Sequence, residues 1–159
     1  MIKIVKYQKK FEKDINKLLI KQWNEQFKHD KNVLGEIALV DGVFAGCCIG
    51  CKKSNYYILK ELCVVEDFRN MKVGTMLLNS FINNVKTQTL SGVDIVAYLL
   101  DNDGRGPNLP RAKRMFEKFN FNFVEVIDGY FAKDNNYEYC PDCKSKPCKC
   151  SAWKYVLKL

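Results

Sequence analysis

The sequence predicts a mixed α/β domain, in which helices cover both faces of one mostly antiparallel central sheet. Segments with strand-like alternation and segments with helical spacing of their apolar residues follow one another along the chain. The dipeptide Asp41-Gly42 is a strong hairpin signal, and it joins two predicted strands that are therefore antiparallel. Residues 93–100 form a nearly unbroken apolar run, which is typical of a strand buried on both faces.

The N-terminal half supplies the first four strands and two helical pieces. Strands are predicted at 2–7, 36–40, 43–51 and 56–65, and the last of these is the central strand. Gly46 and Gly50 in the third strand indicate a bulge or the close approach of another backbone. Between the first two strands, helical spacing favours one helix through Phe11, Ile15, Leu18 and Leu19 and a second helical piece through Trp23 and Phe27.

The C-terminal half alternates helices with strands. A helix with the apolar stripe Val73, Leu77, Phe81 and Val85 precedes the strand 93–100, and a loop with two glycines and two prolines follows at 101–110. Strands at 121–127 and 153–159 complete the sheet. The last helix carries its stripe at Ala112, Met115, Phe116 and Phe119, with Pro110 suited to its first turn and Asn120 suited to a left-handed cap at its end.

Length and charge restrict the classes of protein. The 159 residues are enough for one ordinary domain with a real core, so we expect a single domain over 1–159. A net charge of +8 favours an anionic partner such as nucleic acid, a membrane surface or a phosphate-rich cofactor, although scattered lysines also suit a merely solvated surface. No apolar stretch is long enough to span a membrane and the N-terminus lacks a secretory signal, so we expect a cytoplasmic protein.

The stretch 61–78 has the composition of an anion site. An apolar, strand-like segment ends near Val65, Arg69 follows a short polar turn, and an amphipathic helix begins close to Gly74. The first amides of a helix have no acceptor within the helix, and the helix dipole adds positive potential there. We therefore interpret this stretch as a binding site for a pyrophosphate.

Two motifs carry a resemblance to the GCN5-related N-acetyltransferase (GNAT) superfamily. The first is Arg69-Asn70-Met71-Lys72-Val73-Gly74-Thr75, which resembles the family's acyl-CoA loop, Arg/Gln-x-x-Gly-x-Gly/Ala, with Lys72 in place of the first glycine. The second is Ala112-Lys113-Arg114-Met115-Phe116-Glu117-Lys118-Phe119-Asn120-Phe121, in which Asn120 stands where glycine is usual. The resemblance covers residues 2–127 and the closing strand 153–159.

This resemblance implies transfer of an acetyl group from acetyl-CoA to a primary amine of a small molecule or a protein. It also implies that the pantetheine arm lies against the backbone of the central strand and that the pyrophosphate lies against the amides at the start of the helix. The cofactor-binding residues implied are Leu62, Cys63, Val64, Arg69, Asn70, Met71, Lys72, Val73, Gly74 and Thr75. The alternative is a weakly active or inactive GNAT-like module, which recognises nucleic acid or protein through its basic surface and its cysteine loop.

The catalytic residues depart from the family pattern. Glu61, in the central strand, is our candidate for the base that takes a proton from the amine, with a surface carboxylate as the alternative. The position that matches the family's tyrosine acid is Phe116, so Tyr98, Tyr130, Tyr137 or Tyr139 substitutes for it, or water protonates the thiolate. Asp101 and Asp103 are candidates for binding a cationic substrate or for loop turns, and His29 is better explained as a solvated residue.

Eight cysteines fall into two groups. Cys47, Cys48, Cys51 and Cys63 lie in apolar strands and behave as small buried hydrophobes. A Cys-x-x-Cys and a Cys-x-Cys occur in an insertion at about 137–151, which falls between the last two strands and borders the acceptor site in the resembled family. Four thiolates suit a closed tetrahedral Zn²⁺ site of structural role, with a redox pair or iron as alternatives. These candidate ligands are Cys140, Cys143, Cys148 and Cys150.

Overall fold

The structure is a computed structural model that describes residues 1–23, 26–28, 32–89, 92–101, 110, 112–132, 140 and 142–159. These residues form two compact units, the first of Met1–Ile95 with Leu159 and the second of Val96–Lys158, so the boundary lies within one strand. None of the described helices is both long and apolar enough to cross a membrane. The expectation of a single domain over 1–159 stays a prediction.

The first unit contains an antiparallel meander of four strands. These are β1 (Ile2–Lys6), β2 (Val33–Val40), β3 (Val43–Lys52) and β4 (Tyr56–Val64), and each pairs with the next. Asp41 and Gly42 have φ values of 49° and 85°, as a two-residue hairpin of this twist requires. The hairpin prediction is confirmed, although β2 begins at residue 33 rather than 36.

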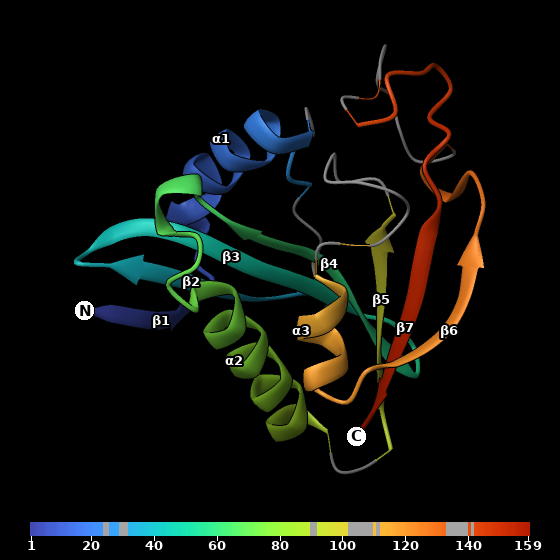
Figure 1. The fold of residues 1–159 in the computed structure, drawn as a ribbon. Helices are drawn as coiled ribbons and strands as arrows, with labels where there is room; N and C mark the ends of the chain where they lie inside the picture. The colour runs from blue at the N-terminus through green and yellow to red at the C-terminus, as the bar shows by residue number, and fades with distance from the viewer. Residues whose placement is uncertain are drawn as a thin grey trace. The chain divides into compact units, whose positions relative to one another are not determined.

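Helices cover both faces of this meander (Figure 1). The elements are η1 (Lys9–Phe11) and α1 (Glu12–Trp23), followed after β4 by η2 (Glu66–Phe68) and α2 (Val73–Gln88). Leu18 and Leu19 of α1 pack in one cluster with Ile37 of β2. Ser80 of α2 reaches Glu36, the neighbour of Ile37 in the strand, and consecutive strand residues point to opposite faces. The two helices therefore lie on opposite faces of β2.

A buried carboxylate anchors α2 to the meander. Glu36 is 2% exposed and accepts hydrogen bonds from Asn84 Nδ2 at 2.7 Å and Ser80 Oγ at 3.0 Å. Lys6 Nζ lies 3.5 Å from the same carboxylate. A charge in such a place is tolerated only when it is paired and hydrogen-bonded, so these partners fix where α2 lies.

The predicted second helical piece is wrong over 26–28. Helix α1 ends at Trp23, and residues 26–28 have no helical structure. The backbone N–H of Phe27 donates to Asn16 Oδ1 at 2.7 Å, and its ring meets that of Tyr7 edge-on at 5.8 Å. These tertiary contacts place the Phe27 ring in the core without a helix, so the i, i+4 spacing from Trp23 is coincidental.

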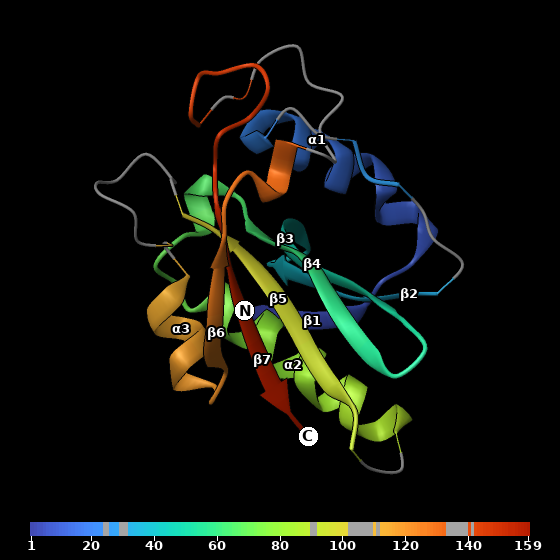
Figure 2. The ribbon, with the colours of Figure 1, turned by 90° about the vertical axis from the view of Figure 1, so that its right-hand side faces the viewer.

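The second unit contains most of β5 (Asp94–Leu100), with α3 (Lys113–Lys118), β6 (Asn122–Ile127), η3 (Tyr130–Ala132) and β7 (Ala152–Lys158). Strand β7 lies between β5 and β6 and is antiparallel to β6 (Figure 2). Asn120 has a φ of 63°, which confirms the predicted left-handed cap after α3. Phe116 is buried against Phe121, with ring centroids 4.8 Å apart.

Candidate functional site

At the end of β4, one edge of the strand backbone faces β3 and the other edge faces away from β3. The N–H of Val65 donates to Ala45 O at 2.8 Å, and the carbonyl of Cys63 lies so close to Gly46 that a Cβ there would be 2.4 Å from its oxygen. The predicted close approach at Gly46 is thereby confirmed. Because successive strand residues alternate their polar groups between edges, the N–H and C=O of Val64 face away from β3.

The carbonyl of Val64 receives two side-chain donors. Gln22 Nε2, from the last turn of α1, lies 3.3 Å from this oxygen, and Arg69 Nε lies 3.4 Å from it. Arg69 is half-buried and is thus tied back to the strand that precedes it. Sequence reasoning identified Arg69 but missed Gln22, because a polar residue near a helix end carries no signal of a contact forty positions away.

The loop after Arg69 leads into the N-terminus of α2 through left-handed backbone. Asn70 and Lys72 both have a φ of 64°, and Lys72 occupies the N-cap position. The first hydrogen bond of the helix runs from Met76 N–H to Lys72 O at 3.0 Å, so the amides of Val73 and Gly74 lie outside the helical ladder. Asn70, Met71 and Lys72 are exposed, whereas Val73 is buried and holds the turn in place. This geometry suits an anion.

Lys72→Gly should stabilise the protein by up to about 1 kcal/mol, because a left-handed residue with a side chain costs about 1–2 kcal/mol and glycine offsets part of the gain through unfolded-state entropy. Denaturant unfolding without ligand measures it. Asn70→Gly is the matched control, since asparagine tolerates the same conformation and should gain less. A Lys72→Gly protein no more stable than wild type would contradict this expectation.

Glu61 lies on the same face of β4 as Cys63, two residues before it in the strand. It is half-buried. Burial is the main cause that raises the pKa of the Cys63 thiol far above its usual range; Cys47 and the Glu61 charge add to this, while Arg69 opposes it. Cys63 therefore stays protonated, and its Sγ donates to Gln22 Oε1 at 2.6 Å.

The remaining catalytic candidates lie in the second unit or outside the described residues. Tyr98, on β5, stacks on Tyr130 with ring centroids 4.5 Å apart. Phe116 is a core residue, as described above. Asp101 Oδ1 accepts a hydrogen bond from the Ser151 N–H at 3.0 Å, so this carboxylate joins two distant segments of the second unit, and neither the local-turn alternative nor substrate binding is confirmed. The other candidates, His29, Asp103, Tyr137 and Tyr139, lie outside the described residues.

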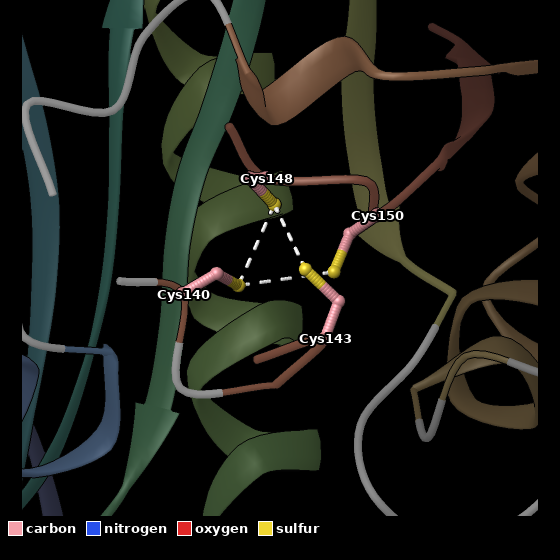
Figure 3. Close-up of side chains that lie close together, drawn as sticks. All are labelled: Cys140, Cys143, Cys148 and Cys150. Atoms are coloured by element: carbon pink, nitrogen blue, oxygen red, sulfur yellow. Dashed lines mark hydrogen bonds between the residues drawn. The ribbon is translucent and has the colours of Figure 1, made fainter. Parts of the chain in front are cut away.

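The four cysteines of the insertion converge (Figure 3). All four sulfurs lie within 4.8 Å of one another. Cys148 Sγ is 3.4 Å from Cys140 Sγ and 3.8 Å from Cys143 Sγ, and the sulfurs of Cys140 and Cys150 are 3.9 Å apart. All four are free thiols, and only Cys143 is not fully buried.

The loop holds these thiols through its own backbone. The Lys144 N–H donates to Cys140 O at 2.9 Å, and the Lys149 N–H donates to Cys143 Sγ at 3.2 Å. Burial would raise the pKa of Cys143, but hydrogen bonds, that of Lys149 first, lower it to about 6. Burial raises the pKa of Cys148 to about 11. The hydrogen bonds of the loop therefore favour the thiolate form of Cys143.

The base of the cysteine loop is tied to neighbouring strand ends within the second unit. Besides the contact with the Asp101 carboxylate, Ser151 O accepts the Asp101 N–H at 3.2 Å. Ser151 Oγ also donates to Asp128 Oδ1 at 2.7 Å. Leu100 and Phe131 pack against the buried cysteines. The cluster thus has an apolar backing and a hydrogen-bonded frame.

Comparisons with known proteins agree with this arrangement. Residues 4–121 match the family model described as "Acetyltransferase (GNAT) family". No curated protein matches the sequence. Many solved structures share its fold. The ribosomal-protein-S18-alanine N-acetyltransferase from Escherichia coli has a TM-score of 0.72 at 12% identity, covering 99% of this chain and 94% of that one.

The aminoglycoside 6'-N-acetyltransferase from Enterococcus faecium has a TM-score of 0.72 at 13% identity, and the match covers 98% of this chain and 96% of that one. A GNAT family acetyltransferase from Elizabethkingia anophelis, with acetyl-CoA bound, has a TM-score of 0.68 at 18% identity, with 99% and 98% covered. At these identities the likeness establishes the fold, and it confirms the predicted α/β class with its central sheet and flanking helices.

Proposed function

Because the chain belongs to the GNAT acetyltransferase family, and is thus an acyl-CoA-dependent N-acyltransferase, we propose that it transfers acetyl from acetyl-CoA to a primary amine of a small molecule or protein. The observation that carries this proposal is the turn from β4 into α2. There Arg69 precedes the amides of Val73 and Gly74, which lie outside the helical ladder, and this turn comes directly after a strand with one edge facing away from β3.

In this proposal, different residues bind different parts of acetyl-CoA. The pantetheine arm lies along the backbone of Leu62, Cys63 and Val64, and the pyrophosphate lies at the turn from Arg69 to Thr75. Gly74 permits close approach of the phosphates, and the exposed Lys72 adds a positive charge beside them.

The chemistry requires a neutral amine and a protonated leaving group. The amine nitrogen attacks the thioester carbonyl, the new N–C bond forms, and the C–S bond breaks. We assign the amine's proton to the Glu61 carboxylate and the proton for the departing thiolate to the Tyr98 hydroxyl or to water. Phe116 supplies no proton, which distinguishes this chain from family members with a tyrosine there.

Steady-state kinetics test these roles. Arg69→Ala should raise KM for acetyl-CoA by roughly 10- to 100-fold, since a charge-assisted hydrogen bond contributes about 1.5–3 kcal/mol. Glu61→Gln should instead lower kcat with little change in that KM, and Tyr98→Phe should do so only if its hydroxyl is the acid. Wild-type protein whose melting temperature is unchanged by saturating acetyl-CoA would overturn the proposal. A salt-sensitive shift with nucleic acid instead would favour the binding-module alternative.

We also propose that the four-cysteine cluster binds one structural Zn²⁺. A tetrahedral site with Zn–S bonds of about 2.3 Å places its sulfurs about 3.8 Å apart, and the closest sulfur pairs lie at 3.4, 3.8 and 3.9 Å. The site is closed by four thiolates, so the ion would stabilise the loop and take no part in acetyl transfer. Exposed Lys144, Lys146 and Lys149 would offset its negative charge. The proposal places the protein in the cytoplasm, where a reducing environment keeps thiols available for the ion.

A further inference from the structure

We propose that Gln22 is a positioning residue for binding of the acyl donor. Its side chain fixes the end of β4, so that Val64 offers its N–H, and not its carbonyl, to the pantetheine arm. This inference rests on the proposed donor site along β4. Gln22 lies on α1, outside both motifs that identify the family, and its side chain is half-buried.

The two donors on the Val64 carbonyl carry the first step. Gln22 Nε2 and Arg69 Nε lie 3.3 and 3.4 Å from this oxygen. A carbonyl oxygen has two lone pairs, so these donors use its full acceptor capacity. A pantetheine amide therefore finds no acceptor at this carbonyl. The N–H of Val64 points to the same edge, which leaves it as this residue's group for a pantetheine carbonyl.

The orientation of the Gln22 amide is fixed from its other end. Cys63 Sγ donates to Gln22 Oε1 at 2.6 Å, which assigns the oxygen to the thiol and the nitrogen to Val64. Cys63 is 2% exposed and remains protonated, so this donor persists across the working pH range. The side chain is thus held at both ends by consecutive residues of β4.

The same contact joins two parts of the first unit. Gln22 is in the last turn of α1, while Arg69 belongs to the loop that we assign to the pyrophosphate. Both side chains meet at one oxygen, so a displacement of the end of α1 would be transmitted to Arg69 through Val64. Lys21 Nζ and Glu66 Oε2, 3.7 Å apart, add an exposed ion pair between α1 and η2.

The substitution Gln22→Glu tests whether Gln22 acts through its hydrogen bond or only through packing. It keeps the shape of the side chain and replaces the N–H group that donates to the Val64 carbonyl. The introduced carboxyl group repels the Val64 carbonyl when it is ionised, and it can donate to that carbonyl when it is protonated. Acetyl-CoA binding by this variant, measured by calorimetry, should be weaker than wild type by tenfold or more at pH 8 and should approach wild type as the pH falls toward 4, because the ordinary pKa of a glutamate carboxyl is about 4.3. The titratable and charged groups around this contact are Cys63 and Arg69, the Cys47 and Glu61 side chains that act on the Cys63 thiol, and the Lys21–Glu66 ion pair.

Gln88→Glu is the matched control. Gln88 lies in the last turn of α2 and donates to Asn84 Oδ1 at 3.1 Å, so the same chemical change occurs at the end of α2 opposite the proposed pyrophosphate turn. It should bind acetyl-CoA like wild type at both pH values. Gln22→Ala, checked for folding by circular dichroism, should raise KM for acetyl-CoA up to roughly tenfold, the value of one neutral hydrogen bond, with kcat less affected.

The outcomes separate this inference from the proposed function. Wild-type protein that binds acetyl-CoA, together with a Gln22→Glu variant that binds equally well at pH 8 or equally poorly at both pH values, would overturn the role of Gln22 alone. Wild-type protein that fails to bind acetyl-CoA would overturn the donor site itself, and the role of Gln22 with it.

Discussion

Cys143→Ala should abolish zinc binding, whereas Cys51→Ala should leave one zinc ion per chain. Both variants remove one thiol, but Cys143 is one of the four converging sulfurs, and Cys51 is a buried residue of β3 outside the cluster. Mass spectrometry of protein purified without added metal measures the ion. Iron in place of zinc would correct the identity of the metal, and no metal in wild type would refute the site.

The two variants should also differ in stability. Cys143→Ala should be the less stable of the two, although packing alone would predict the opposite order. Cys51 is 1% exposed and Cys143 only half-buried, so packing alone would make Cys51→Ala the more harmful change. An ion present at 100 to 1,000 times its dissociation constant contributes about 3–4 kcal/mol. Loss of that contribution should lower the melting temperature of Cys143→Ala by roughly 6–16 °C for a chain of this size.

A chelator supplies the control for this comparison. If the ion is the cause, removing it from wild type should reproduce the Cys143→Ala melting temperature, and it should not lower that of Cys143→Ala further. A Cys143→Ala protein that is as stable as wild type in the absence of chelator would show that the ion contributes nothing to stability.

Gly46→Ala should destabilise the protein by about 3 kcal/mol or more, and it should abolish acetyl-CoA binding. The added Cβ would lie 2.4 Å from Cys63 O and 3.1 Å from Val64 Cα, and both are backbone atoms that cannot rotate away. Strands β3 and β4 would have to separate, with strain of the kind that places a mutation in the severe class. The separation would displace Cys63 and Val64, and we place the pantetheine arm along the opposite edge of these same strand residues.

Gly42→Ala is the matched control for this substitution. Gly42 has a φ of 85° and no atom within 4 Å of an added Cβ, so only the left-handed backbone is strained, at about 1–2 kcal/mol. Urea unfolding measures both variants, and acetyl-CoA titration of folded protein measures the site. A Gly46→Ala protein that unfolds like Gly42→Ala and binds acetyl-CoA normally would contradict the close packing of β3 on β4.

The sequence was sufficient where short-range rules determine the structure. The hairpin at Asp41-Gly42 and the left-handed cap at Asn120 depend on residues that tolerate a positive φ, and the close approach at Gly46 depends on the missing side chain; all three are confirmed. The helical piece at Phe27 was wrong because a tertiary hydrogen bond to Asn16 determines its backbone. Periodicity cannot report a contact between such distant positions.

The same limit applies to the candidate site. Arg69 and the four cysteines of the insertion follow from local spacing, and the structure brings the cysteines together as predicted. Gln22 and Ser151 have no local signal, because each acts through partners on other elements. The sequence pattern marks Glu36 only as a strand residue, although it is a buried carboxylate whose partners come from α2. Polar contacts between elements therefore form the part that sequence reasoning missed.

The hydrogen bonds around Ser151 affect how far the length and composition of the cysteine insertion could vary. Strands β6 and β7 pair as far as Ile127 and Ala152, and Ser151 and Asp128 are joined immediately beyond that pair. The ends of the intervening segment are therefore held together by the hairpin itself. Doubling the length of such a segment adds only about 0.6 kcal/mol of closure entropy. We therefore expect the hairpin to accept segments of different length and chemistry between Asp128 and Ser151 on an unchanged strand register.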